Sequence, residues 1–245
     1  AGVSHEIYAK KDPSKTIESN VSNVINILEK LKKIKKIQFL YISTGSVFQD
    51  IKSEKIKIYE DTVPTPKSIY SGSKRMGEII VESYRKYFRV NCSILRISWV
   101  YGPEEIPKKL NIQRGPIPFI INRILKKKGK TINIATGGQF KASFTYIEDV
   151  VSAIASIISN KTSEESIYHL GSGFNYINYY LVKKIGKILN KKINIGKGFN
   201  PWSSDSVIRG PLIGKNLKKE YDFKIKFNLE KGLKTLLKNY EKYNS

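Results

Sequence analysis

Three side chains in the first third of the sequence have the residue types and the spacing of a proton-transfer site. Thr44 ends the apolar run Phe-Leu-Tyr-Ile-Ser, where polar residues follow a buried segment. Tyr70 and Lys74 lie four residues apart, so they project from the same face of a helix. A phenol has an unperturbed pKa of ~10, and an ammonium one turn away lowers that pKa toward neutral pH. The sequence therefore predicts Tyr70 as an acid/base, Lys74 as its electrostatic partner and Thr44 as the hydroxyl that aligns a substrate oxygen.

The Tyr-x-x-x-Lys spacing is a weak signal by itself because lysine is abundant in this chain. Two further pairs overlap within residues 179–184, and we interpret them as surface residues of an ordinary amphipathic helix. Only the pair at Tyr70 follows a Ser43-Thr44 strand end at the distance that separates a strand from the next helix. The alternative for Thr44 is a strand-end hydroxyl that caps backbone groups.

The elements that must position these residues alternate between strands and helices. The apolar patterns predict strands at 37–43 and 91–100 and helices at 15–33 and 69–88. Such alternation predicts an α/β fold with a doubly wound parallel sheet of the Rossmann type. In an open sheet of this kind, ligands bind outside the carboxyl ends of the strands, where Thr44 lies.

The second half of the chain contains longer polar stretches between its apolar segments. A polar stretch at 104–115 reads as a loop or lid, and another polar loop surrounds Trp202. We predict a Rossmann domain built from 1–103 and 143–173 and a smaller α+β substrate domain built from 104–142 and 174–245. Further expected elements are helices at 117–127, 147–160, 179–189 and 229–243 and a strand at 130–135.

The composition excludes several classes of protein. With 245 residues, 40% hydrophobic and 11% aromatic, the chain has the content of a folded domain. A single cysteine, Cys92, excludes an internal disulfide framework, and two histidines make a zinc cluster implausible, so we expect no metal. No signal peptide and no membrane span are visible in the sequence. We therefore expect a cytoplasmic protein that does not contact a membrane.

The net charge of +23 comes mainly from lysine, since 7 of the 44 basic residues are Arg and 44 − 7 = 37 are Lys. A nucleic-acid surface usually concentrates its charge and uses Arg to contact phosphates and base edges. Here Lys is spread along the chain, which favours a solvated surface over a polyanion site. We therefore do not expect a nucleic-acid partner.

Several segments together resemble the extended short-chain dehydrogenase/reductases. More narrowly, they are similar to the NAD-dependent epimerase/dehydratase family, which acts on nucleotide sugars. The strongest matches are Ser-Thr-Gly-Ser-Val-Phe at 43–48, Tyr-Ser-Gly-Ser-Lys at 70–74 followed by Gly-Glu, and Leu-Arg-Ile-Ser-Trp-Val-Tyr-Gly-Pro at 95–103. Weaker matches follow the family's order at 1–2, 19–21, 60–64, 143–149, 168–173, 209–211 and 217–223.

The resemblance implies NAD or NADP as cofactor and a nucleotide sugar as substrate. Lys74 would also hold the nicotinamide ribose, and Arg209 would clamp the diphosphate of the substrate. The implied cofactor-binding residues are Ala1, Gly2, Ser19, Asn20, Ser43, Tyr70, Lys74 and Ser98. The implied substrate-binding residues are Thr44, Gly45, Ser46, Tyr70, Trp99, Lys141 and Arg209.

Two of these residues have an alternative interpretation, and a third differs from the residue that the family uses. Trp99 suits core packing as well as a ligand wall, and Arg209 suits a plain surface position. Lys141 would take the place of an Arg that the family often has at the next residue, but it offers a single ammonium charge in place of a planar guanidinium.

The helices at 15–33 and 70–88 resemble the pair through which the family forms homodimers, so we expect a homodimer.

The sequence also departs from the family pattern. No Gly-x-x-Gly-x-x-Gly turn occurs, so we expect roughly the first βαβαβ half of the family's Rossmann domain to be missing before Ala1. The chain alone is then not expected to bind a dinucleotide tightly. Sugar 4,6-dehydratases of the family have an Asp-Glu pair after the Thr, where this chain has Gly45 and Ser46, which disfavours dehydration.

Three hypotheses for the activity follow. The first is a sugar epimerase that oxidises a sugar carbon and returns the hydride to its other face. The second is a 4-keto-6-deoxysugar reductase similar to dTDP-4-dehydrorhamnose reductases, although their Asp after the Thr is also replaced by Gly45. The third, from another class, is a non-catalytic relative with a structural or RNA-associated role, favoured by the missing Gly-rich turn and opposed by the retention of Thr44, Tyr70 and Lys74.

Overall fold

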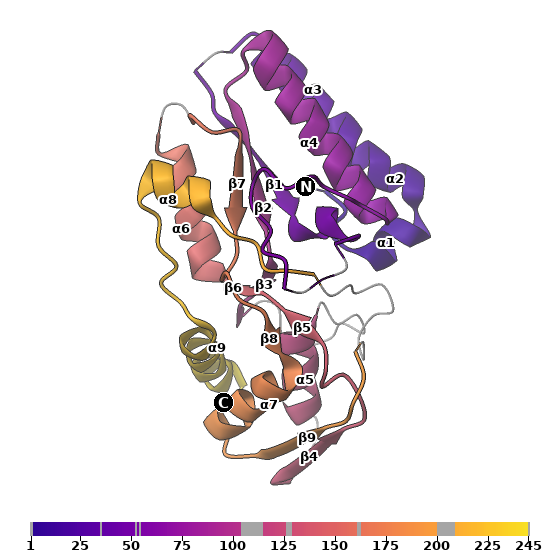
Figure 1. The fold of residues 1–245 in the computed structure, drawn as a ribbon, viewed down its shortest axis with the longest axis vertical. Coiled ribbons are helices and arrows are strands. Elements are labelled where there is room, and N and C mark those ends of the chain that lie inside the picture. The colour runs from indigo at the N-terminus through magenta and orange to yellow at the C-terminus, as the bar shows by residue number, and fades with distance from the viewer. Residues whose placement is uncertain are drawn as a thin grey trace.

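The structure is a computed structural model of the 245-residue chain. It describes residues 2–34, 36–51, 53, 55–103, 115–125, 129–160, 163–199 and 209–244. Ala1, most of the predicted lid and the predicted loop around Trp202 lie outside the described residues. The remainder forms an α/β fold, as predicted (Figure 1).

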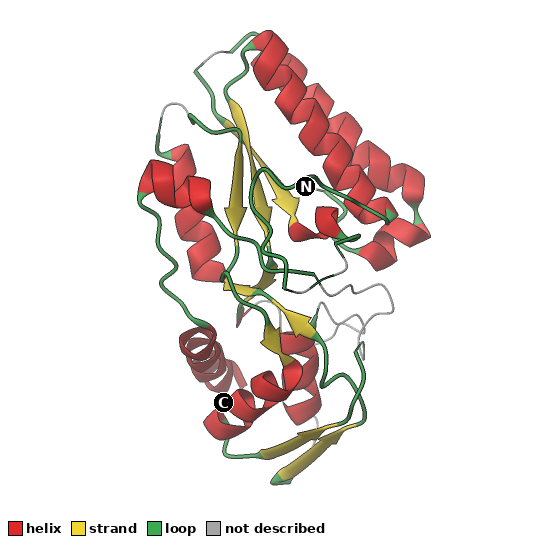
Figure 2. Cartoon of the chain, viewed as in Figure 1, coloured by secondary structure: helices red, strands yellow, loops and turns green. Residues whose placement is uncertain are grey.

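Three parallel strands form the main sheet in the order β1-β2-β7. Helices α3 and α4 pack on one face, where Leu28, Tyr41 and Ile94 share an apolar cluster. Helices α6 and α8 pack on the other, where Leu95 and Leu217 belong to a second cluster. Figure 2 shows these helix layers flanking the strands. The elements are β1 (Phe39–Thr44), β2 (Cys92–Ile97), β7 (Ile167–Leu170), α3 (Asn23–Leu31), α4 (Ile69–Phe88), α6 (Ile147–Ile158) and α8 (Lys215–Tyr221).

The strand predicted at 91–100 is two strands that belong to different sheets. After β2, the N–H of Ser98 donates to the Leu170 carbonyl at 3.0 Å, and the N–H of Trp99 donates to the Ser143 carbonyl at 3.2 Å. The chain thus changes its pairing partner at Ser98, and β3 (Trp99–Tyr101) pairs with β6 (Phe144–Tyr146). A continuous apolar pattern cannot reveal such a change of partner, because both strands are buried.

The helix predicted at 15–33 is interrupted. It consists of α2 (Pro13–Ile17), a π-helical turn (Glu18–Ser22) and α3, and its buried stripe includes Val24, Leu28 and Leu31. The helix α1 (Glu6–Lys11) is not among the predicted elements. The signal was present: Asp12 ends α1 and accepts the Lys15 N–H at 2.9 Å, which starts α2 with Pro13 in its first turn.

Helix α4 was predicted with its observed limits, because both ends carry clear signals. Ser68 is the N-cap and exchanges hydrogen bonds with Ser71, so two backbone donors of the first turn are satisfied. Arg89 adopts a left-handed conformation, with φ of 56°, and ends the helix. Tyr70 and Lys74 therefore lie in the first two turns of a well-defined helix.

A second group of elements packs around the β3–β6 pair. Its core contains Tyr101, Ile120, Phe140, Phe144 and Leu233. One short parallel pair and one short antiparallel pair flank this core. The elements are α5 (Pro116–Leu125), α7 (Asn178–Ile188), α9 (Leu229–Asn244), β4 (Thr131–Ile134) with β9 (Lys192–Ile195), and β5 (Lys141–Ala142) with β8 (Tyr176–Ile177).

In the described residues, none of the helices combines the length and the apolar character needed to cross a membrane. The same residues contain no group of three or more His, Cys, Asp and Glu side chains that could hold a metal ion.

A buried histidine lies beneath the carboxyl end of the main sheet. His169, on β7, is fully buried; its Nε2 accepts from Nη1 of Arg96 at 3.3 Å and its Nδ1 donates to the Ile58 carbonyl at 3.2 Å. Burial, and then the positive charge of Arg96, lower the pKa of His169 from 6.5 to about 3. The imidazole is therefore neutral in the folded chain at neutral pH.

His169 should make the fold sensitive to mild acid. The unfolded chain binds a proton at this residue near pH 6.5 and the folded chain only near pH 3, so stability falls as the pH drops through that window. In urea unfolding, the parent should lose about 2 kcal/mol more than His169→Gln between pH 7.5 and pH 5. Equal losses in the two proteins would contradict a neutral buried His169.

Candidate active site

Thr44 is the last residue of β1 and does two things with its hydroxyl. The oxygen accepts the backbone N–H of Ser46 at 3.1 Å, which caps the tight 3₁₀ turn Gly45–Phe48. The Thr44 hydroxyl also lowers the pKa of the Tyr70 phenol, whose residue stands at the start of α4. The capping alternative therefore holds, and the role of Thr44 beside Tyr70 stays a prediction.

The start of α4 is fixed by residues that the sequence reasoning did not select. The Gln49 Oε1 atom accepts the backbone N–H groups of Lys67 and Ser68 at 2.9 and 3.0 Å, and the Ser71 hydroxyl also donates to it. Glu6, on α1, accepts from the Ser68 hydroxyl and from Gln49. Four polar side chains thus hold the turn that carries Tyr70. Because they come from separate parts of the sequence, no local sequence pattern predicts this arrangement.

The electrostatics around Tyr70 differ from the prediction. Burial raises the pKa of Tyr70, and the negative charge of Glu6 raises it further, whereas the Thr44 hydroxyl and the positive charge of Arg209 lower it. Burial is the largest of these effects, so the pKa lies above 10.0 and the expected decrease toward neutral pH is wrong for this structure.

Lys74 points to the strand and not to the phenol. Its Nζ donates to the Ile42 carbonyl at 2.6 Å and lies 4.2 Å from the centre of the Tyr41 ring. Burial lowers the pKa of Lys74 to about 8, and the nearby charge of Glu78 opposes that decrease. The amine is thus held at the end of β1, one helical turn from Tyr70, and is still mostly protonated at neutral pH.

The residues predicted to hold a cofactor fall into two groups. Gly2 and Asn20 are in close contact, since a Cβ at Gly2 would lie 2.4 Å from the Asn20 Oδ1 atom. The Asn20 amide donates to the Ser73 hydroxyl at 2.9 Å, which ties this contact to α4. Ser19 lies next to them in the π-helical turn.

The other group uses its hydroxyls inside the protein. The Ser43 hydroxyl donates to the Glu78 carboxylate at 2.5 Å, and the Ser98 and Thr145 hydroxyls are 2.6 Å apart. Both serines are buried. Their side chains therefore serve the packing of the strand ends, and contact with a ligand would have to use their backbone.

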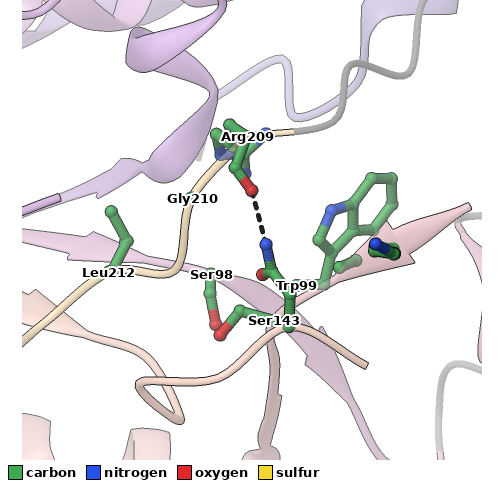
Figure 3. A pocket seen from close by; sticks show the side chains of 9 residues that line it. Ser98, Trp99, Ser143, Arg209, Gly210 and Leu212 are labelled. Atoms are coloured by element: carbon green, nitrogen blue, oxygen red, sulfur yellow. Dashed lines mark hydrogen bonds between the residues drawn. The ribbon is translucent and has the colours of Figure 1, made fainter. Parts of the chain in front are cut away.

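A small cavity brings together four of the predicted residues from distant parts of the chain. Ser98, Trp99, Lys141 and Arg209 all line it (Figure 3). Asn175 lines it too and donates to the Arg209 carbonyl at 2.7 Å; the sequence reasoning missed it. The remaining lining residues are Ala142, Ser143, Gly210 and Leu212.

The structure bears on the two alternative interpretations left by the sequence, core packing for Trp99 and a surface position for Arg209. Trp99 lines the cavity and also packs edge-on against Phe140, with ring centroids 6.5 Å apart, so core packing is observed and the ligand wall stays a prediction. Arg209 is not a plain surface residue: its guanidinium lies over Gly45, where a Cβ would be 2.9 Å from Nη2. Arg209 therefore connects the cavity with the turn that follows Thr44.

A buried ion pair holds α4 against the strands beneath the site. Glu78 and Arg96 are 0% and 1% exposed and form two hydrogen bonds of 2.9 Å each. Arg75, one turn before Glu78, adds a further bond of 3.0 Å to the same carboxylate. Ser43 on β1 completes the set, so a single carboxylate links α4 to β1 and to β2.

Comparison with known proteins places these features in context. The model of the NAD dependent epimerase/dehydratase family matches residues 1–171. A Dictyostelium discoideum protein named dTDP-D-glucose 4,6-dehydratase is 32% identical over 194 residues, which cover 76% of this chain and 43% of that protein. This chain thus spans less than half the length of that relative.

Solved structures give the same fold. A Bacillus anthracis dTDP-glucose 4,6-dehydratase in complex with NAD is 26% identical with a TM-score of 0.76, covering 93% of this chain and 69% of that one. A Thermotoga maritima UDP-glucose 4-epimerase with UDP-glucose is 22% identical with a TM-score of 0.84, covering 100% of this chain and 76% of that one.

The buried ion pair predicts unequal effects of two arginine substitutions. Arg96→Met leaves the Glu78 charge buried without its main partner and should lower the free energy of unfolding by about 3–5 kcal/mol. Arg75→Met removes a cation that is 25% exposed while Arg96 stays in place, and should cost about 1 kcal/mol or less. Urea unfolding at pH 7 compares them; similar losses in the two variants would contradict the stated role of Arg96.

Proposed function

The chain belongs to the NAD dependent epimerase/dehydratase family, and we propose that it carries the chemical centre of an NAD(P)-dependent enzyme acting on a nucleotide sugar. The observation that carries this proposal is that β1 ends at Thr44 while α4 carries Tyr70 in its first turn and Lys74 one turn later, its Nζ 2.6 Å from the Ile42 carbonyl of β1. A phenol and an alcohol beside a strand end can together hold one sugar oxygen.

The residues present fit one end of the cofactor. Gly2, packed against Asn20 without a side chain of its own, leaves a surface that a flat ligand can approach, and the Lys74 ammonium at the end of β1 would donate to ribose hydroxyls. No Gly-x-x-Gly-x-x-Gly turn for the pyrophosphate occurs in the sequence. We therefore assign the nicotinamide-ribose end to these residues.

The proposed chemistry divides the work between the bound cofactor and three side chains. NAD(P) supplies hydride transfer when it is bound. Tyr70 takes the proton of the sugar hydroxyl as its carbon is oxidised and returns it afterwards, Thr44 orients the oxygen, and Lys74 keeps the ribose end in place. Burial of the phenol keeps Tyr70 protonated in the free site. A bound ligand must therefore change the surroundings of the phenol before Tyr70 can act as a base.

Within the family, an epimerase has the best support. Dehydration needs an acid beside the aligning hydroxyl, whereas Gly45 and Ser46 follow Thr44 and the guanidinium of Arg209 occupies the space over Gly45. The same position disfavours the reductase alternative, in which an Asp would follow the threonine. Epimerisation needs no further acid, because the proton and the hydride that leave are the ones that return.

We place the proposed substrate site beside Trp99, Lys141 and Arg209, which line the small cavity. Two cations beside an aromatic ring and several polar groups suit a sugar linked to a diphosphate. Relatives in the same family are named for UDP-glucose and dTDP-glucose, which makes these two nucleotide sugars the first probes.

Tyr70→Phe removes only the phenol oxygen and should lower epimerisation by about 10²–10⁴-fold with little change in stability. The measurement is NMR of UDP-glucose or dTDP-glucose converting to an epimer in the presence of NAD. Because these residues contain no Gly-rich turn, the polypeptide assayed should carry a dinucleotide-binding segment before them.

The matched control is Tyr179→Phe, which removes a hydroxyl from a second Tyr-x-x-x-Lys pair, on the exposed face of α7. It should leave the rate unchanged. Substrate deuterated at the reacting carbon should keep its label in the epimer, whereas stoichiometric oxidation of NAD(P)H by a keto sugar would identify a reductase. A Tyr70→Phe protein as fast as the parent would refute the proposed role of the phenol.

We propose in addition that two copies of the chain associate through the helices at 15–33 and 70–88. In the structure α3 and α4 pack side by side, and their outer surface exposes Ile27, Met76 and Ile79 at 45%, 43% and 47%. An apolar surface of this kind on two neighbouring helices is typical of a helical interface.

The dimer is tested by placing a charge on that surface. Ile79→Glu should reduce the mass found by light scattering from twice 28.0 kDa to 28.0 kDa, because the carboxylate would be buried against its own symmetry copy. Val151→Glu, on α6, introduces the same charge at an apolar residue that is 59% exposed elsewhere and should leave the mass unchanged. A parent protein of 28.0 kDa would contradict the dimer.

A further inference from the structure

Tyr41 lies in the middle of β1, with its side chain on the face of the sheet that α4 covers. It is 5% exposed and shares an apolar cluster with residues of α3 and α4. Its hydroxyl donates to the backbone carbonyls of Asn20 and Lys74, each at 3.4 Å. The ring is therefore held between the strand that ends in Thr44 and the helix that carries Tyr70.

Gly77, on α4, provides the space for this ring. A Cβ at position 77 would lie 2.3 Å from the Tyr41 hydroxyl oxygen and 2.7 Å from the ring carbon that bears it. Only a residue without a side chain lets the helix pack this closely on the ring. The position of the ring is thus set by the packing of α4 against β1.

The ammonium of Lys74 lies over the face of the Tyr41 ring. Its Nζ is 4.2 Å from the centre of the ring and donates to the Ile42 carbonyl at 2.6 Å. A cation within about 6 Å of the centre of an aromatic face is attracted by the negative charge density of that face. The ammonium thus has two partners on β1, a carbonyl and a ring.

The protonation states of the surrounding groups leave the ring face as a neutral partner. Burial raises the pKa of the Tyr41 phenol, and burial likewise raises that of Tyr70, one turn before Lys74, so neither phenol is charged at neutral pH. Burial lowers the pKa of Lys74 to about 8, and the Glu78 carboxylate on the same helix opposes that decrease. A lysine so close to losing its proton responds to a contact of modest strength.

We propose that Tyr41 is a positioning residue for Lys74: its ring keeps the amine charged and holds it at the end of β1, ready for the ribose of a dinucleotide. A carbonyl accepts a hydrogen bond from a neutral amine as well as from an ammonium, whereas the face of a ring attracts the cation. The ribose contact rests on the proposed function. The contact between ring and ammonium does not, and it can be tested without any ligand.

The test weakens the face of the ring without changing its size. Tyr41→Phe keeps the ring, and phenylalanines with one, two or three ring fluorines at position 41 lose the negative charge of the face stepwise while nearly keeping their shape. These variants should therefore fold like Tyr41→Phe. The readout is the titration of Lys74 in the ligand-free chain, followed by NMR of lysines labelled with ¹³C at Cε and assigned by the resonance that Lys74→Arg removes.

Tyr41→Phe should keep the Lys74 midpoint near that of the parent, because it removes only a hydroxyl. Across the fluorinated series the midpoint should fall stepwise, by about 0.5–1 pH unit in total, because the charged amine loses its attraction to the ring. The matched control places the same fluorines at Phe144, whose ring packs against Tyr101 in the second group of elements. That series should leave the Lys74 midpoint unchanged.

A Lys74 midpoint that stays constant across the series at position 41 would overturn the proposal. An equal fall with the fluorines at Phe144 would also overturn it, because the effect would not come from the Tyr41 ring.

The ribose contact is decided separately by kinetics at pH 8, in a polypeptide that carries a dinucleotide-binding segment. The trifluorinated variant should raise the KM for NAD several-fold and change kcat less. A shifted midpoint with an unchanged KM would sustain the contact and refute its link to the cofactor. A shifted midpoint in a parent that turns over no nucleotide sugar would sustain the contact and refute the proposed function.

Discussion

The buried ion pair between Glu78 and Arg96 is the constraint on which the site depends. Removing two charges from water is costly, and the cost is offset only when hydrogen bonds satisfy both groups. Here one carboxylate accepts from Arg96, Arg75 and Ser43, which belong to β2, α4 and β1. Because such a pair tolerates little change of geometry, it fixes the helix that carries Tyr70 against the strand that ends in Thr44.

The remaining site residues arrive from the second half of the chain. β3 begins where the chain changes partner at Ser98, which sets Trp99 at the mouth of the sheet, and the segment at Arg209 crosses back over Gly45. Helix α4 from the first half of the chain and the Arg209 guanidinium from the second half thus both lie near the end of β1. This arrangement brings the proposed proton carrier and the proposed ligand-binding residues to the same edge of the sheet.

The sequence predicted what local signals encode and missed what tertiary contacts decide. The fold class and the limits of α4 followed from apolar periodicity and from the Ser68 cap, and four predicted residues do line one cavity. The direction of Lys74 could not be read, because the Ile42 carbonyl that binds it lies 32 residues away. The contact of Arg209 with Gly45 depends likewise on residues far apart in sequence, whereas α1 was missed despite the Asp12-Pro13 signal.

The central claim is that Tyr70 and Thr44 hold the reacting oxygen of a nucleotide sugar. A crystal structure of the protein with NAD and UDP-glucose or dTDP-glucose tests it most directly. The account predicts one sugar hydroxyl within about 2.6–3.2 Å of both the Tyr70 and the Thr44 oxygens, with the nicotinamide ring against the carbon that bears it. A sugar bound away from this strand end, with neither oxygen in contact with it, would contradict it.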